Sequence, residues 1–279
     1  MLDIVKNRIE IGLDKPVKLL HVTDTHISDT DDRDDALKQR ICLNNDIPKI
    51  REYFRETIDY CNENCDMMVH SGDLISVVSP RSLEVVREFL DTCRNYLIVA
   101  GNHEFSQYCG EAWEGIAYKM TAFQQVQRAL REDLLFTAKQ VGGVNVVGID
   151  NGYYHVEPWQ LWRLQREVKK GLPIVMMMHV PLFEQSLYEE SVRRHSDSCA
   201  YLMGCDEEHL MPFEEYRAYQ QRPTADDLRF IDYVYSQPLI KCVLTGHIHF
   251  HYESMLPCGI PQFVTAKNHS GGAREVTLY

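Results

Sequence analysis

The chain contains 279 residues, of which 44% are hydrophobic and 25% are charged. This composition is typical of a folded globular protein and excludes a disordered chain. Aspartate and glutamate number 41 against 29 lysines and arginines, so the formal net charge is −12. Such a charge repels polyanions at long range, which disfavours nucleic acid and acidic membrane surfaces as partners and favours a small substrate.

The cysteines and the apolar runs bear on the compartment. None of the nine cysteines belongs to a Cys-x-x-Cys pair, which is typical of reduced thiols and predicts a cytoplasmic protein. The first ten residues mix charges into their apolar positions, so we expect no signal peptide. The longest apolar run, near 176–178, is far too short to span a bilayer, so we expect no membrane span.

The N-terminal part of the chain is predicted to alternate strands with helices. Short apolar runs bounded by turn residues indicate strands, and apolar residues spaced three and four apart indicate helices. The predicted strands cover 4–11, 17–22, 66–70 and 96–100, and the predicted helices cover 35–44, 47–64 and 80–92. The acidic stretch 29–35 is interpreted as a solvated loop before the first helix, with an additional cation site as the alternative.

The second half continues the same alternation and adds two longer segments. Predicted helices cover 110–131, 157–170 and 225–237, and predicted strands cover 144–149, 173–178, 239–244, 250–256, 262–266 and 275–278. The last three strands are expected to be antiparallel and to close a second sheet. Segment 184–223 lacks clear periodicity and is interpreted as a cap that shapes the substrate pocket; an insertion without function is the alternative.

No linker marks a domain boundary, so the sequence predicts a single domain, 1–279, with cap insertions expected at about 105–131 and 184–223. Five of the predicted strands are followed directly by side chains that can bind metal ions. In open α/β sheets, sites form beyond the carboxyl ends of the strands, so these side chains should meet at one edge. They are Asp24, His26, Asp73, Asn102, His103, His179, His247 and His249.

Each fragment alone is common by chance, but their combination in this order points to one metal site. Carboxylate, imidazole and amide ligands without a thiolate are suited to borderline and hard cations. Residues two apart in extended chain point the same way, so His247 and His249 can present their rings to one small volume. The sequence therefore predicts a metal site assembled from five separate loops.

The motifs Asp24-x-His26, Gly72-Asp73, Gly101-Asn-His-Glu104, His179 and Gly246-His-x-His249 resemble those of the calcineurin-like metallophosphoesterase superfamily. This resemblance implies an α/β fold, a four-layer αββα sandwich of two mixed sheets flanked by helices. It also implies a centre of two metal ions, divalent or of mixed valence, such as Mn, Fe or Zn. By the resemblance, Asp24, His26 and His249 would bind one ion, Asn102, His179 and His247 the other, and Asp73 would bridge them.

The expected function is that of a metal-dependent phosphoesterase that hydrolyses a small phosphomonoester or phosphodiester. Two divalent ions outweigh the charges of Asp24 and Asp73, so the site should attract a phosphate ester, and a hydroxide shared by the ions is the expected nucleophile. In similar enzymes the position of His103 contacts phosphate beside Asn102 and can protonate the leaving oxygen, so His103 is expected to act as a general acid or as an electrostatic stabiliser. The alternatives are a metal-dependent nuclease on the same scaffold and a non-catalytic binding protein that retains the fold.

Several remaining polar residues are given structural interpretations. His21 and His70 lie within predicted strands and are expected to be core residues with satisfied hydrogen bonds, and His269 precedes a Gly-Gly pair that indicates a turn. Many similar enzymes carry an acidic or amide side chain three positions after the bridging aspartate. Here that position is Ser76, so we expect either a weaker brace from the Ser76 side chain or another group that takes over this role, with the ligand set retained.

Overall fold

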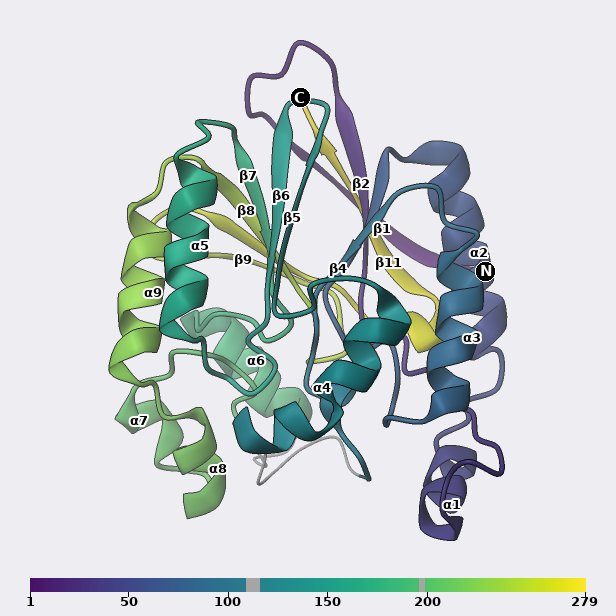
Figure 1. Cartoon of the computed structure of the whole chain (residues 1–279). Helices are drawn as coiled ribbons and strands as arrows, with labels where there is room; N and C mark the ends of the chain where they lie inside the picture. The colour runs from purple at the N-terminus through teal and green to yellow at the C-terminus, as the bar shows by residue number, and fades with distance from the viewer. Residues whose placement is uncertain (109–115, 196–198) are drawn as a thin grey trace.

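The computed structural model describes residues 1–108, 116–195 and 199–279. Two β-sheets lie face to face at the centre, and helices cover the outer face of each (Figure 1). The expected α/β sandwich of two mixed sheets is confirmed. The start of the predicted helix 110–131 and residues 196–198 of segment 184–223 lie outside the described residues.

The first sheet has five strands in the order β1-β11-β2-β3-β4. Strands β2, β3 and β4 are parallel, and β11 is parallel to β1 but antiparallel to β2. The strands are β1 (Asp3–Ile9), β2 (Val17–Val22), β3 (Met67–His70), β4 (Tyr96–Ile98) and β11 (Gly272–Leu278).

The second sheet has six strands in the order β5-β6-β7-β8-β10-β9. Strands β6, β7, β8 and β10 are parallel, while β5 and β9 form antiparallel edges. The strands are β5 (Phe136–Val141), β6 (Val144–Ile149), β7 (Ile174–Met177), β8 (Ile240–Thr245), β9 (Tyr252–Met255) and β10 (Pro261–Val264).

Helices complete the outer layers of the sandwich. Figure 1 shows α2 (Ile50–Asn64) and α3 (Pro80–Leu90) beside the five-stranded sheet, and α5 (Pro158–Val168) and α9 (Ala225–Ser236) beside the six-stranded sheet. The described part of the chain contains further helices. They are α1 (Ala36–Asn44), η1 (His103–Phe105), α4 (Ile116–Leu130), α6 (Gln185–His195), α7 (Glu207–Leu210), α8 (Glu215–Gln221) and η2 (Asn268–Ser270).

The core consists of an apolar layer between the sheets and one outside each sheet. Leu19 of β2 belongs to the cluster between the sheets together with Val146 of β6. Its neighbour Leu20 belongs to the cluster that contains Phe54 of α2. Alternate side chains point to opposite faces and both faces are covered, so central strands such as β7 carry apolar side chains on both faces.

The prediction that the tail closes a single second sheet is wrong. Strands β9 and β10 do join the six-stranded sheet, but β11 lies between β1 and β2 in the other sheet. Apolar alternation indicates which faces of a strand are buried, but it does not identify the neighbouring strand. The partners β1 and β11 come from opposite ends of the chain, so local pattern could not pair them.

Two further elements differ from the expectation. Strand β5 was not predicted, although the pair Gly142-Gly143 that follows it has positive φ at both residues and joins it to β6 as a hairpin. Such a two-residue glycine turn is a recognised hairpin signal. Segment 184–223, which lacks periodicity in sequence, contains α6, α7 and α8. The last two are too short for a helical period to show clearly.

Two further expectations concern reduced cysteine thiols and the absence of a membrane-spanning helix. The eight cysteines within the described ranges all carry free thiols; Cys109 lies outside these ranges. Among the helices of the described residues, none combines the length and the apolar character needed to cross a bilayer.

Candidate metal centre

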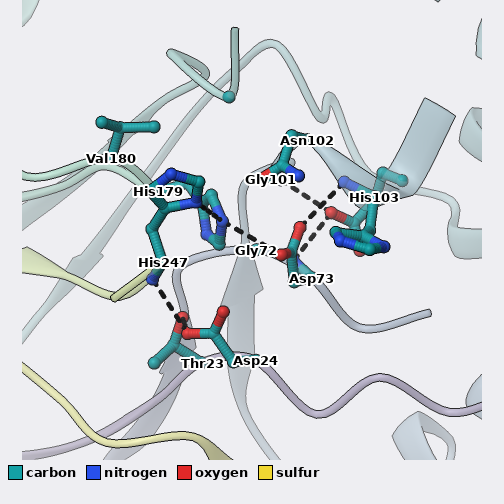
Figure 2. A network of polar contacts seen from close by, with 12 residues as sticks. Thr23, Asp24, Gly72, Asp73, Gly101, Asn102, His103, His179, Val180 and His247 are labelled. Atoms are coloured by element: carbon teal, nitrogen blue, oxygen red, sulfur yellow. Dashed lines mark hydrogen bonds and ion pairs between the residues drawn. The ribbon is translucent and has the colours of Figure 1, made fainter. Parts of the chain in front are cut away.

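The predicted ligand loops meet at one edge of the sandwich, beyond the carboxyl ends of parallel strands. Asp24 follows β2, Asp73 follows β3 and Asn102 follows β4 in one sheet, while His179 follows β7 and His247 follows β8 in the other. Figure 2 shows these side chains directed towards one small volume. The convergence predicted from strand order is therefore observed for all five loops.

Backbone hydrogen bonds tie these loops to one another. The Asp24 amide donates to Gly72 O at 3.0 Å, and the Gly246 amide donates to His179 O at 2.9 Å. A third bond joins the two sheets, because the His247 amide donates to Asp24 Oδ2 at 3.0 Å. The relative positions of the loops are thus fixed by the protein itself.

Most of the candidate ligands have an unusual backbone conformation. Nine non-glycine residues in the described part of the chain have positive φ, and five of these are Asp24, His26, Asp73, His247 and His249. The left-handed region is unfavourable for residues that carry a Cβ and is found most often at functional sites. Here it turns the chain sharply after a strand and brings the side chain over the sheet edge.

Two motif glycines allow the loops to approach closely. A Cβ at Gly101 would overlap Asp73 Oδ1 and would lie 2.8 Å from His179 Cγ. A Cβ at Gly246 would lie 2.6 Å from Asp24 Oδ2. Neither position tolerates a side chain without moving a candidate ligand.

The first ligand group consists of Asp24, His26 and His249. Asp24 Oδ1 lies 3.1 Å from His249 Nε2 and 3.8 Å from His26 Nε2. One ligand atom from each of the three residues lies within 4.8 Å of the others. Asp24 and His26 are buried, whereas His249 is partly exposed, so this group borders the solvent.

The second ligand group consists of Asp73, His179 and His247, all buried. Asp73 Oδ2 lies 3.1 Å from His179 Nε2, and His247 Nδ1 lies 3.2 Å from the same nitrogen. The Nδ1 atom of His179 donates to Ser71 O at 3.0 Å. Because a carbonyl can only accept, this bond leaves Nε2 as the nitrogen that faces the site.

Asp73 joins the two groups. Its Oδ2 atom lies 3.7 Å from His26 Nε2 and 3.1 Å from His179 Nε2. His26, Asp73 and His103 form a further group with ligand atoms within 4.8 Å of one another. One carboxylate oxygen therefore stands between a histidine of the first group and a histidine of the second.

Asn102 and His103 border Asp73 on its other side. Asn102 is buried and lies beside Asp73 (Figure 2). The His103 amide donates to Asp73 Oδ1 at 2.9 Å, and the ring Nδ1 donates to Ser76 O at 2.6 Å. The His103 ring packs edge-on against His26, with ring centroids 4.6 Å apart. His103 thus faces the site while a backbone carbonyl fixes its ring.

Glu104, the last residue of the Gly-Asn-His-Glu motif, binds the backbone of two ligand loops. Its buried carboxylate accepts hydrogen bonds from the amides of Asp73 at 2.8 Å, Leu74 at 2.6 Å and Gly101 at 2.6 Å. Burial and the nearby charge of Asp73 raise the pKa of Glu104 to about 7. This side chain holds together the loops that carry Asp73 and Asn102.

The electrostatics of the site favour ionised Asp73 and neutral His247. Burial opposes ionisation of Asp73, but the charges of His179 and His103 outweigh it and hold its pKa below the ordinary value. Burial holds the pKa of His247 well below its ordinary value. His179 is also buried, yet the charge of Asp73 raises its pKa to about 9. Histidines bind metal ions in the neutral form, so metal binding at this site should weaken as the pH falls.

The donor set fits metal ions. Two buried ligand atoms, Asp24 Oδ1 and His26 Nε2, form no well-aligned hydrogen bond within the described residues, although Asp24 Oδ1 lies 3.1 Å from His249 Nε2. Buried polar atoms are normally satisfied, so atoms left without a partner at a ligand cluster indicate a group that completes them. Imidazole and carboxylate atoms at these positions are ligands for ions such as Mn, Fe and Zn.

Three residues near the site were not predicted from the sequence as part of it. The Tyr154 hydroxyl lies 3.0 Å from His247 Nε2, and the Tyr201 ring packs 5.5 Å from the His247 ring. The His269 ring lies 5.7 Å from His26 and 5.8 Å from His249. Tyr154 follows the end of β6 on the same sheet edge, which is a weak sequence signal for a position at the site. Tyr201 and His269 have no such signal in the sequence.

The interpretation of the strand histidines is confirmed. His21 is buried between Ser71 Oγ at 2.9 Å and Thr265 Oγ1 at 2.7 Å. His70 is buried with its Nε2 2.9 Å from Thr25 Oγ1. Both rings are satisfied within the core and lie outside the three ligand groups.

Comparisons with known proteins agree with this geometry. The family model described as calcineurin-like phosphoesterase matches residues 17–251. A dimetal phosphatase from Danio rerio is 14% identical, with 94% of this chain and 93% of that chain covered and a TM-score of 0.57. The purple acid phosphatase PPD1 from Lupinus luteus is 14% identical, with a TM-score of 0.56, but the match covers 93% of this chain and only 45% of that one. No curated protein matches the sequence at a significant level. The family match spans most of the sequence, and the chain belongs to the calcineurin-like phosphoesterase family.

Proposed function

We propose that the chain is a phosphoester hydrolase that uses two metal ions to cleave a small phosphomonoester or phosphodiester. The observation that carries this proposal is the position of Asp73 Oδ2, 3.1 Å from His179 Nε2 and 3.7 Å from His26 Nε2. A carboxylate oxygen shared by two ligand groups suits a pair of ions. The Danio rerio protein with the same fold is itself named a dimetal phosphatase, which supports the proposal.

In this proposal each ligand group holds one ion, and Asn102 is added to the second group. Asp24, His26 and His249 hold the first, Asn102, His179 and His247 hold the second, and Asp73 contributes to both. Bound ions of this kind supply an activated water as nucleophile and stabilise negative charge on the phosphoryl oxygens. The rigid loops hold the ligands in place before the substrate arrives, so little reorganisation is needed during the reaction.

His103 and Asn102 are proposed to act on the substrate. The Nδ1 atom of His103 is engaged with Ser76 O, so Nε2 is the nitrogen that can contact a phosphoryl oxygen or give a proton to the leaving oxygen. The hydrogen bond from the backbone amide of His103 to Asp73 Oδ1 keeps the His103 ring beside the carboxylate that is proposed to bridge the ions. Asn102, on the adjacent position, is proposed to contact the phosphoryl group as well as the second ion.

The local charge of the site explains how an acidic protein can bind an anionic substrate. The chain carries a formal charge of −12, but among the described residues the ligand groups contain two carboxylates, those of Asp24 and Asp73. Two divalent ions outweigh these two charges, so the field at the site is positive although the far field is negative. This balance favours a small phosphoester over a polyanion such as nucleic acid.

We also propose that the chain forms a single domain and that segments 105–131 and 184–223 cap the site. The second segment reaches the site through Tyr201, whose ring packs against His247. Its apolar side chains share a cluster with Ile248 and Phe250 of the His247 loop. The first segment is joined to the β6 loop by an ion pair between Lys119 and Asp150. These contacts support the proposal that both segments shape the substrate pocket.

A hydrolysis assay tests the proposed function. Protein supplied with Mn²⁺, Fe²⁺ or Zn²⁺ should hydrolyse p-nitrophenyl phosphate or its bis ester, and chelation should abolish the activity. Cleavage of single-stranded DNA that falls steeply with salt, without hydrolysis of the small esters, would favour the nuclease alternative. Loaded protein that is inert towards every generic phosphoester would favour a binding protein that retains the fold.

A further inference from the structure

The ring of His247 is held at both of its nitrogens. Its Nδ1 lies 3.2 Å from His179 Nε2, on the side of the second ligand group, and its Nε2 lies 3.0 Å from the Tyr154 hydroxyl. A neutral imidazole carries one N–H and one lone pair, so the partner of one nitrogen determines whether the other can bind a metal. The group opposite Nε2 therefore controls what Nδ1 presents to the site.

Tyr154 is well placed to exert this control. It is 2% exposed, and its amide donates to Asn151 O at 2.8 Å. The Asn151 side chain in turn accepts from the amides of His179 and Val180, both at 3.0 Å, and donates to Val180 O at 2.8 Å. The turn that carries Tyr154 is thus bonded directly to the loop that carries His179.

The backbone at Tyr154 adds a second observation. Nine non-glycine residues within the described ranges have positive φ; five are candidate ligands, and two more are Tyr154 at 69° and Tyr201 at 58°. The rings of these two tyrosines pack against the His247 ring, with centroids 5.6 Å and 5.5 Å away. A strained conformation at an aromatic residue persists only where the surroundings enforce it, and such positions gather at functional sites.

The arrangement at His247 mirrors that at His179 with the two nitrogens exchanged. His179 donates from Nδ1 to Ser71 O and turns Nε2 towards Asp73. His247 turns Nδ1 towards the site and Nε2 towards Tyr154. In metal sites, a ligating histidine generally donates its other N–H to a protein acceptor, which fixes the tautomer and orients the ring.

We propose that Tyr154 is a positioning residue for the second metal ion. Its hydroxyl oxygen accepts the Nε2–H of His247, which fixes the tautomer whose Nδ1 lone pair is directed at the site. Tyr154 does not touch the ion or the substrate; it acts through His247. The inference rests on the proposed function, because it assumes that His247 is a ligand of the second ion.

Calorimetric titration of metal-free protein with Mn²⁺ tests the inference on Tyr154→Phe. This substitution keeps the ring and removes only the acceptor. One of the two binding steps should weaken by about 10- to 100-fold, the range found when such partners are removed, while the other stays unchanged. Tyr60→Phe is the matched control. Tyr60 lies on helix α2, outside the ligand groups, and its hydroxyl donates to Glu275 Oε2 of β11 at 2.7 Å. This substitution should alter stability but neither binding step.

The outcomes separate this inference from the function on which it rests. Two binding steps in the wild type with unchanged affinities in Tyr154→Phe would overturn the role of Tyr154 alone. Fewer than two steps in the wild type would overturn both proposals. If Tyr154→Phe does not fold, ¹⁵N NMR of His247 in the metal-free wild type decides the matter. A proton on Nε2 supports the inference, and a proton on Nδ1 contradicts it.

Discussion

The Nδ1 atom of His103 donates to the carbonyl oxygen of Ser76 across 2.6 Å. This contact explains how the site accommodates serine where many similar enzymes carry an acidic or amide side chain. The brace on His103 comes from the backbone of Ser76, while its side-chain hydroxyl donates to His26 O at 3.1 Å. These contacts agree with the expectation that another group takes over the role of the missing side chain, here the backbone carbonyl of Ser76.

Replacing His103 with alanine should impair chemistry more than metal binding. The residue is proposed to contact the phosphoryl group or protonate the leaving oxygen, and proton transfer of this kind contributes about 10²- to 10⁴-fold to a rate. Turnover of an alkyl phosphate, which has a poor leaving group, should fall by that factor, and turnover of p-nitrophenyl phosphate should fall much less. Metal content measured by elemental analysis should not change. An equal loss of metal and of turnover would contradict the assigned role.

Replacing Ser76 with alanine should leave the leaving-group dependence intact. The carbonyl that holds His103 is retained, and only the hydroxyl bond to His26 O is lost. A neutral hydrogen bond contributes about 1 kcal/mol to stability, so a small drop in the unfolding free energy is expected in urea titration. A collapse of turnover like that expected for His103→Ala would show that the side chain, not the backbone, positions the imidazole.

Replacing Glu104 with glutamine should destabilise the metal-free protein. Both carboxylate oxygens accept backbone N–H groups, and the amide nitrogen of glutamine would face at least one of these donors. An unsatisfied buried donor costs about 1–3 kcal/mol, which chemical denaturation can measure. Glu84→Gln is the control, because Glu84 pairs with Arg33 at the protein surface and such pairs contribute little. Equal effects of the two substitutions would refute the supporting role of Glu104.

The buried Asp227 should make the free energy of unfolding depend on pH in the acid range. Burial would raise its pKa, but hydrogen bonds from His155, Thr224 and the Val156 amide outweigh burial and lower it. A carboxyl whose pKa is lower in the folded state than in the unfolded state stabilises the fold above its unfolded pKa, about 3.9. That contribution is lost as the pH falls through the lowered folded value.

The variant Asp227→Asn measures this effect. Its amide nitrogen would meet N–H and O–H donors, so at pH 7 the unfolding free energy should fall by about 1–3 kcal/mol. The gap between wild type and variant should narrow as the pH is lowered below about 4, because the wild type then loses its ionised carboxylate. A gap that stays constant down to acid unfolding would show that ionisation of Asp227 does not stabilise the fold.

The candidate ligands could be brought together from the sequence because each loop that carries them follows a buried strand. The apolar run of β3 locates Asp73, and the run of β7 locates His179, without knowledge of any long-range contact. Since parallel strands end at one edge, sequence order was sufficient to bring these residues together. The left-handed backbone at Asp24 and His247, by contrast, has no marker in the sequence, because neither residue is glycine.

Contacts made through tertiary structure could not be predicted. Tyr154 reaches His247 only because its turn is anchored to the loop of His179 through Asn151. His269 reaches His26 and His249 because β11 inserts between β1 and β2, which places η2 beside the site. The first contact joins residues 93 positions apart, and the second depends on the pairing of β11 with strands from the opposite end of the chain. Local pattern encodes neither.

The most direct test of the account is a titration of metal-free protein with Mn²⁺ in which p-nitrophenyl phosphate hydrolysis is measured after each addition. With Asp73 Oδ2 shared between the two ligand groups, activity should rise as the second equivalent binds and should remain low at one equivalent. Full activity at a single equivalent, or none after two ions have bound, would contradict a reaction that needs a pair of ions at this carboxylate.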